Sequence, residues 1–372
     1  MPHMIVAVTG KRQLREFVQL PARIHNGHKL WVPGIFQDDL DYLDPARNRF
    51  SVNSETVLYM AYQNKRPVGR IMGLINRRYN ETQHEKIARF TLFDCIEDVE
   101  IARSLLQAVE GWAADRGMER VVGPKGFSNL DPQGILIEGF EFEPTMSAFY
   151  NFEYIPKYME ACGYSKQVDY VNYHILVPQE MPAVYEKVYT RISHRRGIRL
   201  IEFNDKKKLQ PYILPVFRLM NDAYRNIHGF LAFDDDEIRS ISNKFMPVIN
   251  PNFVKVVEKE GEVMAFVLGI PNMNDGFRKA RGRLFPFGFL HILRSAKSSK
   301  KLDLLLGAIK DECRGQGLDV LMGVAMIHSA RELGIQYIDS NQELEQNHKV
   351  RAEMERVGGK VFKRSRIYQK EL

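Results

Sequence analysis

A turn rich in glycine, placed between an apolar segment and a helical pattern, is the part of this chain best suited to bind phosphate. The segment Leu304 to Ile309 predicts a strand, and apolar residues recur at helical spacing from Leu318 onward. Between them lie Arg314, Gly315, Gln316 and Gly317. Glycine lets the backbone adopt positive φ angles, and the free N–H groups of a first helical turn bind phosphate. We therefore expect a pyrophosphate group at this turn.

Two common nucleotide-binding motifs do not fit the spacing. A Walker loop needs a Lys-Ser/Thr pair after its last glycine, where this chain has Leu318-Asp319, and a dinucleotide fingerprint needs a third glycine. The remaining pattern resembles the acetyl-CoA loop of the GNAT family of N-acyltransferases, Arg/Gln-x-x-Gly-x-Gly/Ala. Arg314 and Gly317 match its first and fourth positions, whereas Asp319 places a carboxylate at the last one. The alternative is an ordinary turn that caps a helix.

The order of the following elements also resembles the GNAT core. Ile335 to Asp339 predicts a second strand, and Asn347 begins a short helical pattern that stops at Gly358-Gly359. A last strand is predicted from Val361 to Tyr368. The position of the tyrosine general acid usual in this family falls on Met354.

The resemblance implies that acetyl-CoA or a longer acyl-CoA is the acyl donor, that an amine is the acceptor, and that no metal is needed. A backbone N–H in the first strand would stabilise the thioester oxyanion, which is typically worth about 3 kcal/mol of barrier. The residues assigned to the donor are Leu306, Gly307, Ala308, Ile309, Arg314, Gly315, Gln316, Gly317, Leu318 and Asn347. The amine must lose a proton before it attacks. The candidate bases, all on the loop after the second strand, are Glu343, Glu345 and His348.

These elements must be positioned by a chain of 372 residues, which exceeds the size at which single cores stop growing. The 44% apolar and 27% charged residues fit a soluble globular protein, and no apolar run approaches the roughly 20 residues of a membrane span. Three widely spaced cysteines exclude a disulfide framework and indicate a reducing compartment, so we expect a cytoplasmic protein. His25 and His28 have a spacing found in metal sites, but we expect exposed turn histidines because no cysteine or carboxylate joins them.

The order of predicted elements recurs after about 200 residues, which indicates an internal duplication. A hairpin at 56–75, a helix at 101–113 and a strand at 121–123 correspond to elements at 253–270, 318–333 and 335–339. We predict an α/β (α+β) protein of two tandem GNAT-like domains, 1–180 and 181–372. Each would have a mixed, mostly antiparallel central sheet flanked by helices.

The two halves differ at the proposed phosphate turn. The first half has Asp94-Cys-Ile-Glu-Asp98 there, and its three carboxylates would repel a pyrophosphate. We therefore expect acyl-CoA only in the second domain and assign the acceptor side to the first, whose long connection after 123 is typical of functional loops. The acceptor candidates are Asn129, Asp131, Glu138, Tyr150, Asn151 and Tyr154.

A basic segment at 278–301 contains eight lysines or arginines and no acidic residue, together with an apolar block. This pattern suits the surface of an anionic membrane or the phosphates of the donor. Nucleic acid is a third option with weak support, because no nucleic-acid-binding motif accompanies the patch. The alternative is that Phe285, Phe287 and Phe289 pack on the core.

The tandem plan, with Gly282 to Gly288 before the donor strand, resembles the two-domain bacterial GNAT proteins of the YghO type. Some members are associated with N-acylation of long-chain bases in bacterial ceramide synthesis. The resemblance implies an acyl-CoA-dependent N-acyltransferase acting on a primary amine, with a lipid or long-chain amine as one option. One rival hypothesis is a Fem-type transferase that uses aminoacyl-tRNA. Another is a degenerate GNAT that only binds a ligand, as Asp319 and Met354 would suggest.

Overall fold

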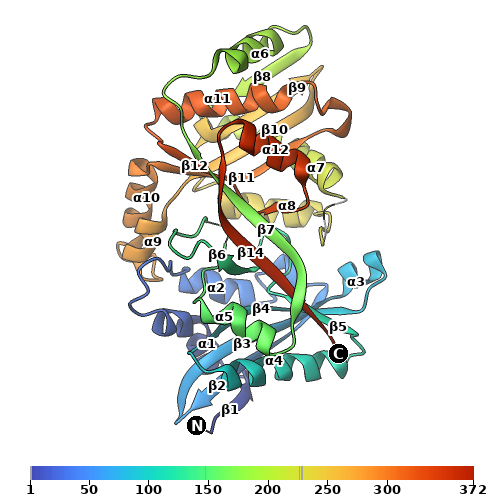
Figure 1. Ribbon diagram of the computed structural model, residues 1–372, viewed down its shortest axis with the longest axis vertical. Coiled ribbons are helices and arrows are strands. Elements are labelled where there is room, and N and C mark those ends of the chain that lie inside the picture. The colour runs from blue at the N-terminus through green and yellow to red at the C-terminus, as the bar shows by residue number, and fades with distance from the viewer. Residues whose placement is uncertain (1, 147, 226, 228) are drawn as a thin grey trace.

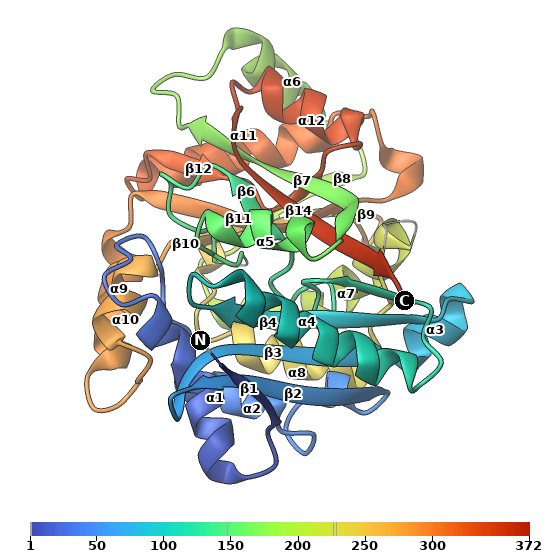
Figure 2. The same ribbon diagram turned by 60° about the horizontal axis from the view of Figure 1, so that its bottom comes forward.

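A single sheet of fourteen strands connects the two halves of the molecule (Figures 1 and 2). The computed structural model describes residues 2–146, 148–225, 227 and 229–372. Along the main path the strand order is β1-β2-β3-β4-β5-β14-β7-β12-β11-β10-β9-β8, while β6 pairs with β14 and β13 pairs with β7. Most neighbouring strands are antiparallel, and the parallel pairs are β4 with β5 and β11 with β12. The predicted fold class is confirmed: helices flank a mixed, mostly antiparallel sheet.

The first half has helices on both faces of its strands. Its elements are β1 (Met4–Ala7), α1 (Lys11–Ile24), α2 (Phe36–Leu43), η1 (Arg49–Ser51), β2 (Ser54–Gln63), β3 (Arg66–Asn76), α3 (Arg77–Gln83), β4 (Ile87–Cys95), α4 (Val99–Ala114), β5 (Arg120–Gly123), β6 (Ile135–Glu138), α5 (Tyr154–Ala161) and β7 (Ser165–Leu176). Successive side chains of β3 point to opposite faces of the sheet and therefore pack in two different cores. Ile71 packs with the buried side of α4, whereas Met72 packs with α1.

The second half repeats this plan. Its elements are α6 (Ala183–Ser193), β8 (Ile198–Glu202), η2 (Lys206–Tyr212), α7 (Ile213–Tyr224), α8 (Asp235–Phe245), η3 (Pro251–Phe253), β9 (Val254–Lys259), β10 (Glu262–Pro271), α9 (Asn274–Ala280), α10 (Gly288–Ser298), β11 (Lys301–Ile309), η4 (Asp311–Cys313), α11 (Leu318–Glu332), β12 (Tyr337–Asp339), β13 (Glu343–Leu344), α12 (His348–Arg356) and β14 (Lys360–Glu371). Apolar residues of α6 and α11 share one core, and those of α7 and α8 share another. The strands and helices predicted around the phosphate turn are confirmed, including the helix after Asn347, whose side chain accepts a hydrogen bond from the Val350 N–H.

The last strands of the two halves are exchanged at the centre of the sheet. β14, from the end of the chain, pairs with β5 of the first half through Tyr368 to Glu371. β7, from the first half, pairs with β12 of the second half through His174 to Leu176. β14 and β7 also pair with each other, so that they cross the middle of the molecule together (Figure 1). Each half therefore supplies a strand that the other half needs, and a division near residue 180 remains a prediction.

The basic segment forms a helical hairpin of α9 and α10 at one side of the molecule (Figures 1 and 2). Phe285 and Phe287 are 77% and 65% exposed, and Phe289 is 38% exposed. The alternative that these rings pack on the core is therefore wrong, because Ile292 and Ala280 fill the contact with the sheet instead. At the corresponding position between β3 and β4 the first half has only the short α3. Within the described residues, no helix has both the length and the apolar character to cross a bilayer.

Candidate active site

β12 pairs only with the beginning of β11. Lys301 to Asp303 pair in parallel with the whole of β12, Tyr337 to Asp339, and β12 ends there while β11 continues to Ile309. On its other edge β11 stays paired with β10 as far as Ile309. No described strand pairs with residues 304–309 on the side facing β12. We call this region the splay. An edge that no strand pairs is a template for an extended ligand.

A bulge at Leu305 produces the splay. The register of β11 against β10 shifts there, since Leu306 pairs with Leu268 and Leu304 with Gly269. One extra residue reverses the faces of a strand. Before the bulge, Leu304 packs toward the core of α11, and after it Leu306 packs toward the core of α7 and α8. The Asn341 side chain donates a hydrogen bond to the Leu305 carbonyl at 2.9 Å, which holds the two walls at the narrow end of the splay.

The predicted phosphate turn lies at the far end of β11. Gly315 and Gly317 have φ angles of 73° and 85°, and Gly317 is the N-cap residue of α11. Leu318, the first helical residue, is buried, so the start of the helix is fixed. This geometry supplies the free N–H groups expected of an anion site.

Arginines surround the same turn and partly offset its carboxylates. Arg314 and Arg225 both form ion pairs with Asp311, at 2.9 and 3.1 Å. Arg195, at the end of α6, donates a hydrogen bond to Gln316 at 3.1 Å. Sequence reasoning missed Arg195 and Arg225, because they lie about 120 and 90 positions from the turn along the chain. Asp319 lies in the first turn of α11, as expected from the sequence.

Glu343 and Tyr224 belong to the walls of the splay. The Tyr224 hydroxyl donates a hydrogen bond to the Gly307 carbonyl at 2.9 Å, and the Gly307 N–H points to the same oxygen at 3.4 Å. Burial, and then the nearby Glu343 carboxylate, raise the pKa of Tyr224. Burial and the Glu353 carboxylate raise the pKa of Glu343 to about 7. The splay therefore contains a carboxyl group that titrates near neutral pH and a phenol that stays protonated. Tyr224 gave no sequence signal.

The other two candidate bases are placed differently. Glu345 pairs with Arg364 and lies 3.4 Å from Lys166, so its carboxylate is already neutralised by cations. His348 is exposed at the start of α12. Met354, at the family's tyrosine position, packs beside the core of α11 and β12.

The corresponding loop of the first half is closed by its own side chains. Asp94 pairs with Arg70 at 3.0 Å and with His25 at 3.1 Å, and Asp98 caps α4 by accepting from the Glu100 N–H. His25 is only 3% exposed, between the stacked rings of Trp31 and Phe152. The expectation of an exposed turn histidine is thus wrong for His25, because Asp94 and Phe152, both distant in sequence, enclose it together with the nearby Trp31.

Most acceptor candidates already use their hydrogen-bonding groups within the chain. The Asn151 amide bonds both backbone groups of Leu136, and Tyr154 donates to the Cys95 carbonyl at 2.8 Å. Three more are also bonded within the chain: Asp131 accepts hydrogen bonds from the Ser128 N–H and the Tyr42 hydroxyl, Tyr150 donates to the Phe140 carbonyl, and Glu138 pairs with Arg364. Asn129 is half-buried in the same connection. These contacts indicate structural roles for all of the acceptor candidates except Asn129.

A buried charged cluster lies at the closed end of the splay. Asp303 and Asp339 pair directly across β11 and β12, and both are nearly inaccessible. Asp303 accepts hydrogen bonds from the Met146 N–H at 2.9 Å and from Asn272 at 3.1 Å. Burial and the Asp339 carboxylate raise the pKa of Asp303 to about 7. Burial lowers the pKa of Lys363 to about 8, and its Nζ has no hydrogen-bond partner among the described residues.

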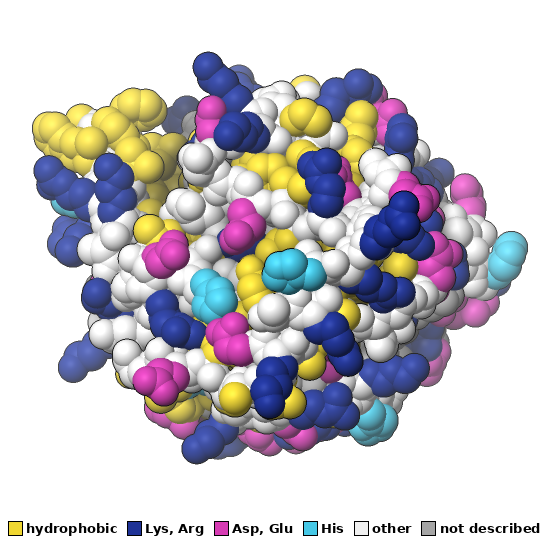
Figure 3. Space-filling view, turned by 90° about the horizontal axis from the view of Figure 1, so that it is seen from above, with side chains coloured by type: hydrophobic (Ala, Val, Ile, Leu, Met, Phe, Trp, Pro, Cys, Tyr) yellow, Lys and Arg dark blue, Asp and Glu magenta, His cyan; other side chains and the backbone are white. Residues whose placement is uncertain are grey.

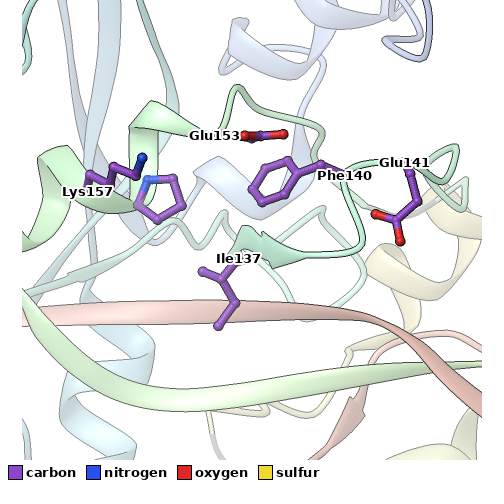
Figure 4. Close-up of a pocket in the computed structure, with 6 residues that line it drawn as sticks. Ile137, Phe140, Glu141, Glu153 and Lys157 are labelled. Carbon is purple, nitrogen blue, oxygen red and sulfur yellow. The ribbon is translucent and has the colours of Figure 1, made fainter.

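A shallow groove of about 510 Å³ lies elsewhere, between β6 and α5 (Figure 4). Its lining residues are Ile137, Phe140, Glu141, Glu153, Pro156 and Lys157. All of them come from the first half, and none belongs to the phosphate turn or the splay. Among the described residues no group of three or more His, Cys, Asp or Glu side chains could hold a metal ion.

Comparisons with known proteins agree with this architecture. No model of a known protein family matches the chain. It is 26% identical to a protein of Caulobacter vibrioides named bacterial ceramide synthase, over 99% of this chain and 97% of that protein. It is 22% identical to the protein YghO of Escherichia coli, over 98% and 94% of the two chains. A solved tandem GNAT protein from the clavulanic acid biosynthesis pathway superposes with a TM-score of 0.60 at 11% identity, over 100% of this chain and 98% of that one.

Proposed function

We propose that this chain, which has the tandem GNAT fold, transfers an acyl group from acyl-CoA to the primary amine of a long-chain base. The proposal rests on the splay. There a strand edge that no strand pairs begins at a bulge and ends at a helix N-terminus with arginines beside it. An elongated thioester with a pyrophosphate at one end matches this layout. A ceramide is an amide of a long-chain base, so the name of the Caulobacter relative agrees with N-acylation.

The donor would bind along β11. The N–H groups after Gly315 and Gly317 would bind the pyrophosphate, with Arg195, Arg225 and Arg314 beside it. The pantetheine amides would bond to the edge of β11 between residues 304 and 309 that no strand pairs, as a peptide adds to a sheet. A backbone N–H of this edge would stabilise the oxyanion of the tetrahedral intermediate, an effect worth about 3 kcal/mol of barrier.

Glu343 and Tyr224 would move the protons. Glu343 accepts a proton from the amine, directly or through water, and its pKa of about 7 suits that role at neutral pH. The amine nitrogen forms a bond to the thioester carbon, and the carbon–sulfur bond breaks. Tyr224, in place of the family's tyrosine at Met354, then donates its proton to the departing thiolate, and the phenolate that remains takes the second proton from the nitrogen.

An assay of thiol release tests this function. The protein is mixed with palmitoyl-CoA or acetyl-CoA and with a long-chain base or a short primary amine, and free CoA and the amide product are measured. We expect amide formation with the long-chain base and one CoA bound per chain in a calorimetric titration. Two bound CoA molecules per chain, or an amide formed only from aminoacyl-tRNA, would contradict the proposal.

A tyrosine variant tests the proposed acid. Tyr224→Phe should lower kcat by about ten- to a hundredfold and leave CoA affinity nearly unchanged, since it removes a proton donor and not a binding group. Tyr212→Phe, at the N-cap of the same helix, is the matched control. Equal losses in both variants would remove Tyr224 from the chemistry.

A further inference from the structure

The tip of the α9–α10 hairpin carries an unusual group of exposed apolar side chains. Phe285 and Phe287 lie in the connection, and three more side chains follow on α10 with exposures of 37% to 48%: Phe289, Leu290 and Leu293. At one edge of the molecule apolar side chains gather, with Lys and Arg side chains beside them (Figure 3). An exposed apolar group of this kind marks an interaction surface.

The root of the hairpin is firmly packed, so loose folding does not explain the exposed tip. A Cβ at Gly276 would lie only 2.5 Å from the Cα of Ile292, which shows how closely the two helices approach. The Phe36 N–H donates to the Gly282 carbonyl at 2.9 Å, and Arg278 pairs with Glu143. The sheet and the first half both hold the hairpin in place.

Cations surround the apolar tip without acidic partners. The segment 278–301 has eight lysines and arginines and no Asp or Glu. Six of them are exposed and form no ion pair with any residue that the structure describes: Lys279, Arg281, Arg283, Arg294, Lys297 and Lys300. An apolar tip flanked by cations complements the interface of an anionic bilayer. Aromatic side chains enter the boundary of the acyl chains there, and cations contact the lipid phosphates.

The hairpin lies at the acyl end of the proposed donor site. It joins the start of β11 at Lys301, whereas the phosphate turn follows the end of that strand at Ile309. Nine residues at about 3.3 Å each separate the two ends by about 30 Å. Leu305, the bulged residue of the splay, packs against the core of the hairpin. A donor bound by its phosphates at the turn would therefore direct its acyl group toward the hairpin.

We infer that the α9–α10 hairpin is an anchor for anionic membranes. The tip rings insert into the lipid interface and the six cations bind lipid phosphates, which places the narrow end of the splay beside an amine dissolved in the bilayer. The delivery of that amine rests on the proposed function, whereas the binding to lipid does not.

Vesicle flotation tests the anchor. The full chain is mixed with vesicles of phosphatidylglycerol and phosphatidylcholine, or of phosphatidylcholine alone, at low and high salt. We expect binding to the anionic vesicles that weakens with salt. Arg294→Gln, Lys297→Gln and Lys300→Gln together should weaken it by at least about tenfold, since each cation near the surface contributes about fivefold. Phe285→Ser with Phe287→Ser should abolish binding even at low salt.

The charge control replaces Lys207, Lys208 and Lys259 by Gln, which removes three exposed cations away from the hairpin. Vesicle binding should not change. Equal weakening in this control, or no binding of the wild type to anionic vesicles at low salt, would overturn the anchor. A concentration-dependent dimer that only the phenylalanine variant abolishes, without vesicle binding, would instead assign the tip to a second copy of the chain.

A CoA titration of the same proteins separates this inference from the proposed function. The hairpin variants should bind CoA with unchanged affinity, because the phosphate turn lies at the other end of β11. Vesicle binding by a protein that binds no CoA would leave the anchor standing and remove the acyltransferase proposal.

Discussion

At the scale of single residues, partial burial separates the roles of neighbouring carboxylates. Glu343 and Glu345 are two positions apart, yet the pKa of Glu343 is raised to about 7 while Glu345 pairs with Arg364 and Lys166. A carboxylate that cations hold is a poor base, because its negative charge is already stabilised. A carboxyl group removed from water, with no cation beside it, takes up protons near neutral pH.

Glu343→Gln should lower kcat/KM for amine acylation by about a hundredfold or more. In the wild type the base must be deprotonated, so kcat/KM should rise with pH and level off above a pKa of about 7. The control is Glu345→Gln, which should keep most of the activity and the same pH profile. A wild-type profile that falls through pH 7, or an active Glu343→Gln protein, would exclude Glu343 as the base.

The raised pKa of Asp303 makes the stability of the protein depend on pH. Its pKa is raised from 3.8 to about 7, so the folded state binds a proton more tightly than the unfolded state does. The stability that this proton provides is fully present below pH 4 and is lost as pH rises to 7. Asp303→Asn should therefore increase the free energy of unfolding at pH 8 by on the order of 2–4 kcal/mol, with little change near pH 4.

Urea unfolding at several pH values measures the effect of Asp303→Asn, with the exposed Asp115→Asn as the control. A variant that is destabilised at pH 8 would mean that the ionised Asp303 is stabilised by its neighbours. Lys363 would then be its partner, since it lies in the same buried cluster.

At the scale of elements, the start of α11 combines a phosphate-binding geometry with an opposing charge. Gly317 keeps its positive φ, and a Cβ there would lie 3.3 Å from Ile192 of α6. A side chain at 317 would thus disturb the packing of α6 as well as any ligand. Asp319, in the first turn of the helix, is a cleaner probe of the binding of phosphate.

Asp319→Asn should tighten CoA binding by about two- to fivefold, because it removes a negative charge near the pyrophosphate. The same change should lower stability by about 0.3–1 kcal/mol, since the helix N-terminus loses a favourable carboxylate. Calorimetric titration and thermal unfolding measure the two effects. Glu332→Gln, in the last turn of α11, should leave CoA affinity unchanged. Weaker binding by Asp319→Asn would show that the carboxylate supports the loop.

At the scale of the whole molecule, the exchanged strands make the two halves dependent on each other. Without residues 181–372, β7 would lose all three of its partner strands, β14, β12 and β13, and β5 would lose β14. Unpaired strands at the centre of a sheet expose backbone groups that cost free energy and promote aggregation.

We predict that fragments 1–180 and 181–372 do not fold separately and that co-expression restores a soluble complex. The intact chain should unfold in one cooperative transition. Circular dichroism during urea unfolding, followed for the fragments, their complex and the intact chain, measures this. Cooperative unfolding of either fragment alone would show that the exchange is dispensable.

The sequence by itself determined the local elements. The order of strand, turn and helix at 304–332 and the cap at Asn347 follow from residues within a few turns of one another. Periodicity, glycine conformation and capping are short-range properties, so one sequence reveals them. The likeness of the two halves also indicated a tandem fold.

Only the tertiary structure decided which distant residues meet. It placed Tyr224 beside Gly307, paired β14 with β5, enclosed His25 and buried Asp303 next to Asp339. It also left Phe285 and Phe287 in solvent, whereas the sequence left packing on the core open as an alternative. These outcomes depend on strand pairing and packing between segments far apart in the chain, where local propensity carries no information.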